Sequence, residues 1–133
     1  GNWSDGLFYD QLVSSVKGTW TDFGQGTNKA KINVGVTVDG AEVTISMMVN
    51  AERTGGNDDR FSYRITRTNP DGSTTYVGDV LKAGMANSPG TINWIWTDNG
   101  LAAGDYVYTL QGRSDVGDGR FYGVKLIGEI GYR

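Results

Sequence analysis

Apolar and polar residues alternate along most of the chain, which is the pattern of β-strands whose two faces meet different surroundings. The clearest case is residues 31–50 (KINVGVTVDGAEVTISMMVN), where only Asp39-Gly40 interrupts the alternation. Asp-Gly between two alternating runs is a strong signal for a two-residue turn, because Gly readily adopts the positive φ that the turn requires. The pattern therefore predicts an antiparallel hairpin of strands 31–38 and 41–50.

The same alternation returns in shorter segments that are separated by turns rich in Gly, Asp and Asn. These segments are residues 19–23, 61–66, 74–81, 92–97, 106–110 and 121–132. The turn Asn69-Pro70-Asp71-Gly72 predicts a second hairpin, because Pro presets φ and Gly accepts the left-handed position that closes the turn. In total we expect an all-β, antiparallel sandwich or barrel of roughly eight to ten short strands.

Domain organisation follows from length and glycine content. The chain has 133 residues with 21 Gly and 2 Pro, which suits one domain with many tight turns. Residues 1–18 are expected to form an N-terminal arm and residues 19–133 the single β domain.

Composition removes several classes of function. The net charge of −3 leaves no basic excess for phosphate neutralisation, so we expect no nucleic-acid partner. The chain has no Cys and no His, which excludes thiolate chemistry, Ser-His-Asp triads and the commonest metal ligand. No segment approaches the ~20 apolar residues of a membrane span, and no signal peptide is visible. The Asp-rich turns lack the spacing of a calcium-binding EF-hand loop, so no metal or cofactor is expected.

A catalytic role is also not expected. A glycosidase needs two carboxylates that face each other across a sugar. Glu42 and Glu129 lie on predicted strands, but nothing in the sequence pairs them. We therefore predict that the chain is not an enzyme.

Three stretches, taken together, resemble a known family. They are Trp20-Thr21-Asp22, the segment YRITR at residues 63–67, and LAAGDYVYTLQGR at residues 101–113 before the terminal strand. Together they are similar to the jelly-roll modules, of the tumour-necrosis-factor type, of bacteriophage tail-fibre tips and head decoration proteins. The resemblance covers residues 19–133 and implies a jelly roll, a homotrimer and a place on the virion surface.

The last third of the chain is expected to form the subunit interface. In the terminal strand, Tyr122, Val124, Leu126 and Ile130 are predicted to fill the core, which leaves other apolar residues outside. The resemblance adds the strand at residues 106–110, which lies near the trimer axis in that family. The expected interface residues are Tyr106, Tyr108, Phe121, Ile127 and Tyr132.

The tryptophans divide into two groups. Trp94 and Trp96 share one strand face with Ile92, so core packing is expected for both. Trp3 and Trp20 lie outside this pattern and are the candidate ligand-facing aromatics.

The first functional interpretation is a non-enzymatic, trimeric decoration or cement protein of a bacteriophage capsid. Its expected partners are its own copies and the major capsid protein or another virion protein. The alternatives are a tail-fibre or tailspike tip that binds a host surface glycan, and a free-standing carbohydrate-binding module.

Overall fold

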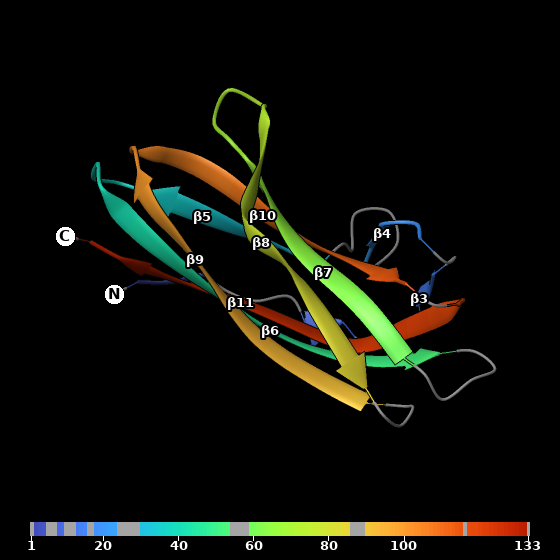
Figure 1. The fold of residues 1–133 in the computed structure, drawn as a ribbon. Helices are drawn as coiled ribbons and strands as arrows, with labels where there is room; N and C mark the ends of the chain where they lie inside the picture. The colour runs from blue at the N-terminus through green and yellow to red at the C-terminus, as the bar shows by residue number, and fades with distance from the viewer. Residues whose placement is uncertain are drawn as a thin grey trace.

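A computed structural model of the chain describes residues 2–4, 8–9, 13–15, 18–23, 30–53, 59–85, 90–115 and 117–132. Two antiparallel sheets pack face to face as a sandwich, which confirms the predicted all-β jelly-roll class (Figure 1). Sheet A contains β1 (Asn2–Ser4), β2 (Phe8–Tyr9), β3 (Val13–Ser15), β6 (Ala41–Arg53), β9 (Gly90–Leu101) and β11 (Gly119–Gly131). Sheet B contains β4 (Thr21–Asp22), β5 (Lys31–Val36), β7 (Asp59–Thr68), β8 (Thr74–Met85) and β10 (Gly104–Ser114).

Strand order places long strands at the centre of each sheet. In sheet A the order is β1-β11-β6-β9, and β2 and β3 also pair with β11. In sheet B the order is β4-β10-β7-β8, and β5 also pairs with β10. The segment expected as an arm thus contributes β1, β2 and β3 to sheet A. Asn2 pairs with Ile130, so the two ends of the chain lie together (Figure 1).

The predicted alternation sets the core. In β5 every second residue is buried, and the same holds along β6, where Val43, Ile45, Met47 and Val49 are all 3% exposed or less. Both strands therefore have one face inside the sandwich and one outside, as the sequence predicted.

The hairpin predicted around Asp39-Gly40 is wrong. β5 pairs with β10 in sheet B, whereas β6 pairs with β9 and β11 in sheet A. The Asp-Gly turn is a corner between the sheets: Gly40 has a φ of +91° and its N–H donates to the Leu101 carbonyl at 2.8 Å. The Asp39 carboxylate accepts a 2.8 Å bond from the Ala103 N–H, where β9 crosses to β10. The local turn chemistry is the same for a hairpin and a corner, so the sequence signal did not distinguish them.

The second predicted hairpin is confirmed. β7 and β8 pair directly, with Thr68 opposite Thr74. The turn closes through a 2.9 Å bond from the Gly72 N–H to the Asn69 carbonyl, and Gly72 has a φ of +87°.

A β-bulge in β11 corrects the predicted faces of the terminal strand. The register of β11 against β6 shifts between Tyr122 and Lys125, where Gly123 has a φ of +61°. An extra residue there moves the inward face from Phe121 to Val124. Phe121 is therefore fully buried, with its ring 4.8 Å from that of Phe23, and its expected place outside the sandwich is wrong.

Trp94 and Trp96, which were both predicted to pack in the core, differ in burial. Trp96 is 4% exposed and its indole N–H donates to the Asp79 carbonyl at 3.2 Å, in a bulge of β8 on the opposite sheet. Trp94 lies two residues earlier on the same side of β9, the last strand of sheet A, and is 48% exposed. Core packing is thus confirmed for Trp96 and wrong for Trp94.

A polar cluster joins the two sheets inside the sandwich. Asp98 of β9 accepts two bonds from the Arg67 guanidinium of β7, at 2.8 and 2.7 Å, and one from the Tyr108 hydroxyl of β10, at 2.7 Å. Burial, the hydrogen bond to Asp98 and the Asp98 charge raise the pKa of Tyr108 above its ordinary value of 10.0. A carboxylate in so dry a position needs such donors, because an unpaired buried charge is costly.

We predict that Asp98→Ala lowers the free energy of unfolding by about 3 kcal/mol, because it leaves the Arg67 guanidinium and the buried Tyr108 hydroxyl without their acceptor. Urea titration measures the change. Asp105→Ala, at an exposed position of β10, is the matched control and should have little effect. Equal losses in both variants would contradict the bridging role of Asp98.

Tyr63 is also buried, but among the described residues it lacks a partner of the kind that Asp98 provides for Tyr108. Its hydroxyl is buried and has no hydrogen-bond partner in the described part of the chain. Burial, with a smaller contribution from the Asp115 charge, raises the pKa of Tyr63. The unfolded chain ionises near the ordinary value of 10.0 and the folded chain only above it, so stability falls as pH rises beyond that value.

We therefore predict that Tyr63→Phe raises the free energy of unfolding by about 1 kcal/mol, since a hydroxyl without a partner is removed from the core. The variant should also lose less stability than the unmodified chain above pH 10.0. Urea titrations at neutral and alkaline pH test both effects, and Tyr76→Phe, at an exposed tyrosine, is the control. A clear loss of stability in Tyr63→Phe would show that its hydroxyl has a partner.

Candidate functional site

The structure separates the five expected interface residues. Tyr106, Tyr108 and Phe121 are at most 6% exposed and belong to the core, so they are unavailable to a neighbouring subunit in this fold. Ile127 lies on the outer face of sheet A, opposite Ser46. Tyr132 follows β11, and its hydroxyl oxygen accepts bonds from the N–H and the hydroxyl of Thr37 at 3.2 and 3.0 Å.

The two candidate ligand-facing aromatics lie on different sheets. Trp3 pairs with Glu129 in sheet A, and its side chain lies outside the described part of the structure. Trp20 precedes β4 in sheet B and stacks on two guanidinium groups, with its ring centroid 4.1 Å from Arg64 and 4.7 Å from Arg113. Trp20 is thus placed against two cationic side chains.

Trp20 belongs to a surface on the outer face of sheet B that we call the cationic face. Alternating side chains of β7 and β10 point outward here, and β8 contributes Tyr76 and Lys82 to the same surface. The cationic face consists of Trp20, Arg60, Ser62, Arg64, Tyr76, Lys82, Arg113 and Asp115. Arg113, Ser62 and Lys82 lie in one row, because Ser62 pairs with Arg113 on one side and Lys82 on the other.

Hydrogen bonds hold the two arginines in place. The Arg64 Nε donates to the Gln111 side chain at 2.7 Å, and Gln111 donates in turn to Asp22 at 2.7 Å. The Arg113 Nε donates to Asp115 Oδ1 at 2.7 Å, while Asp115 Oδ2 accepts from the Ser62 hydroxyl at 2.5 Å. Hydrogen bonds therefore hold both guanidinium groups in position, and both groups lie against the Trp20 ring.

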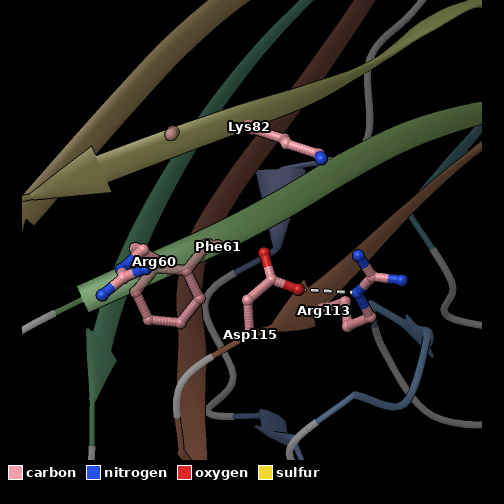
Figure 2. A pocket seen from close by; sticks show the side chains of 6 residues that line it. Arg60, Phe61, Lys82, Arg113 and Asp115 are labelled. Atoms are coloured by element: carbon pink, nitrogen blue, oxygen red, sulfur yellow. Dashed lines mark hydrogen bonds and ion pairs between the residues drawn. The ribbon is translucent and has the colours of Figure 1, made fainter.

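A pocket of about 410 Å³ opens in the cationic face (Figure 2). Its lining residues are Arg60, Phe61, Lys82, Ala83, Arg113 and Asp115. Figure 2 shows Lys82 and Arg113 on one side of the Asp115 carboxylate and Arg60 on the other. Among the described lining residues, three cationic side chains thus surround one carboxylate.

The outer face of sheet A has the opposite character. Ile127 of β11, Ser46 of β6 and Ile95 of β9 lie in one row, and Met48 lies in the next. Ile95 is 60% exposed, and a groove of about 510 Å³ runs beside it, lined by Ser46, Met47, Asn93, Trp94 and Ile95. Trp94 pairs with the buried Met47, so it lies on the inner side of β9, but it is 48% exposed and lines the groove at the edge of the sheet. We call Met48, Ile95 and Ile127 the apolar face.

The Asp-rich turns do not assemble a metal site within the described residues, where no group of three or more acidic side chains has suitable geometry. Asp98 and Asp115 are bonded to arginines instead. In the same described residues, no helix is long and apolar enough to span a bilayer.

Sequence reasoning missed most of the cationic face. The signal was present in the strand at residues 61–66, where Ser62 and Arg64 occupy the positions between apolar residues. Lys82 was missed because the predicted strand 74–81 ends before it, and Arg113 because the strand at 106–110 was predicted to end before it.

No protein-family model matches the sequence, and no curated protein matches it. Among solved structures, the fold is similar to the Eiger TNF of S. frugiperda, with a TM-score of 0.55 and 16% identity over 99% of this chain and 94% of the other. A CocE/NonD family hydrolase of Staphylococcus aureus gives a TM-score of 0.53 and 8% identity, over 97% of this chain and 36% of the hydrolase. Infectious bursal disease virus, Gx strain, gives 0.51 and 10%, over 96% of this chain and 32% of that chain.

These likenesses show the fold alone, because the sequence identities are low. The chain spans little more than a third of the hydrolase and less of the viral protein. They support a jelly roll of the kind found in a tumour-necrosis-factor relative and in a virus particle.

Proposed function

We propose that the chain is a non-catalytic structural domain of a bacteriophage virion, a homotrimer that decorates the capsid surface. The observation that carries the proposal is the apolar face of sheet A. Ile95 is 60% exposed, Ile127 lies in its row and Met48 in the next, and Trp94, which is 48% exposed, lines the groove at the adjoining edge of β9. Soluble monomers rarely keep a contiguous apolar surface of this kind open to water.

The position of the apolar face strengthens the argument. It borders β9, the last strand of sheet A, which pairs only with β6 among the described strands. An exposed edge strand with large apolar side chains promotes uncontrolled association unless it is covered. Closed cyclic symmetry covers such a surface with identical copies and leaves no sticky edge. The virion assignment rests on the resemblance of residues 19–133 to phage jelly-roll modules, and the whole-length likeness to Eiger TNF is consistent with that type of jelly roll.

We predict that light scattering gives a mass three times the 14.4 kDa of one chain. Ile95→Asp combined with Ile127→Asp should reduce the mass to that of one chain and leave the circular dichroism spectrum unchanged, because both side chains lie outside the core. Phe121→Asp would not test the interface, since Phe121 is fully buried and the introduced charge would unfold the chain.

Val80→Asp is the matched control, because Val80 is a 42% exposed apolar residue on the last strand of sheet B. It should not change the mass. A single-chain mass of the unmodified protein at micromolar concentration would refute the trimer. An unchanged trimer in the double variant would refute the apolar face as its interface.

A second candidate function is the binding of a host glycan, as in a tail-fibre or tailspike tip or a free-standing carbohydrate-binding module. The specific observation that favours it is Trp20, which the stacked guanidinium groups of Arg64 and Arg113 hold on the cationic face. A rigid aromatic ring beside fixed polar donors suits a sugar ring with its hydroxyl groups. This face lies on the sheet opposite the apolar face, so both functions are compatible in one molecule.

A further inference from the structure

We propose that the cationic face binds an acidic saccharide, whose carboxylate or sulfate group is held between Arg113 and Lys82. The proposal rests on the second candidate function, glycan binding, and specifies the charge of the ligand. It is independent of the trimer, because it uses only residues of sheet B.

Arg64, Arg113 and Lys82 have hydrogen-bond donors that no described residue uses. Within the described residues, Arg64 and Arg113 each donate a hydrogen bond only through Nε. Their terminal nitrogens therefore remain for a ligand, and a guanidinium presents them in a planar fork that matches a carboxylate or sulfate. The Lys82 side chain has no hydrogen bond or ion pair in the described part of the chain, and it is exposed.

Asp115 is the one carboxylate among the described residues that line the pocket. Both of its oxygens are already engaged, Oδ1 by the Arg113 Nε and Oδ2 by the Ser62 hydroxyl. It therefore orients Arg113 rather than neutralising Lys82. Among the described lining residues, Lys82 therefore keeps a charge that Asp115 does not neutralise, in a chain whose net charge is −3.

Aromatic rings lie beside these cations on the cationic face. Arg64 lies within cation–π distance of two rings, 4.1 Å from the Trp20 centroid and 4.8 Å from that of Tyr76. Tyr76 is 63% exposed, so its ring is open to a ligand. Aromatic rings beside a charged pocket fit a ligand with both apolar ring faces and an acid group, which is the chemistry of an acidic sugar.

A nucleic acid also combines rings with negative charge, but the cationic face suits it less. Single-stranded nucleic acids bind along positively charged grooves that follow several successive phosphates. Here the positive pocket is local, and Asp115 and Asp22 lie within and beside the surface. One acid group per binding unit matches this arrangement better than a continuous phosphate chain.

Calorimetry with the full chain tests the proposal. The acidic probes are hexameric oligogalacturonate, sialyllactose and a heparin-derived hexasaccharide, which separate carboxylate from sulfate recognition. The neutral probes are methyl-esterified oligogalacturonate and lactose, which keep the sugar rings and remove the charge. We expect at least one acidic probe to bind, with an affinity that falls as salt rises and at least about tenfold above its neutral counterpart.

Lys82→Gln should weaken that binding about tenfold, because it removes one charged contact without disturbing any hydrogen bond of the fold. Arg113→Gln should weaken it at least as much. Lys125→Gln is the control, since Lys125 is an exposed lysine of sheet A. Its affinity should equal that of the unmodified chain.

The outcomes separate the two levels of the proposal. Equal binding of neutral and acidic probes would overturn the acidic preference and keep glycan binding. Failure of every probe to bind at millimolar concentration would overturn both. Equal binding of a single-stranded oligonucleotide of the same charge, or equal losses in Lys82→Gln and Lys125→Gln, would show that the face attracts polyanions without recognising a sugar.

Discussion

The carboxylate of Asp98 is the contact on which the arrangement of the two sheets depends. It joins β9 of sheet A to β7 and β10 of sheet B through Arg67 and Tyr108. Side chains on a strand alternate between faces, so fixing one residue inside fixes the face of every neighbour. With Arg67 inside, Arg64 and Ser62 lie outside, and with Tyr108 inside, Gln111 and Arg113 lie outside. With Asp98 inside, Ile95 lies outside. One buried cluster therefore sets the register of both functional faces.

The alternation of apolar residues and the turn residues predicted the features that depend only on neighbouring residues in the sequence. The alternation along β5 and β6 gave their buried residues, and the turn at Asn69-Pro70-Asp71-Gly72 gave a real hairpin. The choice between a hairpin and a corner at Asp39-Gly40 depends on which strands pair across the sandwich, and the turn itself carries no information on that choice. The same limit applies to β11, where a single extra residue at the Gly123 bulge exchanged the inner and outer faces and buried Phe121.

The functional residues were harder to predict, because each requires contacts between strands. Trp20 was singled out from sequence, but the arginines beneath it lie far along the chain in β7 and β10. Of the expected interface residues, Ile127 belongs to the apolar face, while Tyr106, Tyr108 and Phe121 fill the core. The jelly roll itself supports many functions, so the argument for function rests on the two outer faces rather than on the fold. Those faces differ sharply, one apolar beside an edge strand and the other cationic and aromatic.

The central claim is that the two outer faces have separate tasks, protein contact on sheet A and ligand binding on sheet B. The tryptophan indole N–H signals of the nitrogen-15-labelled chain test it, in the presence of a soluble paramagnetic agent that weakens signals of exposed groups. Trp94 is 48% exposed in a single chain and lines the groove beside Ile95 at the edge of β9. The account predicts that a neighbouring copy seated on this edge protects Trp94, and that buried Trp96 is protected as a reference. Trp20 should be weakened at first and become protected when the acidic oligosaccharide that binds most tightly is added. Strong weakening of Trp94, or protection of Trp94 and not Trp20 by the oligosaccharide, would contradict the division of tasks.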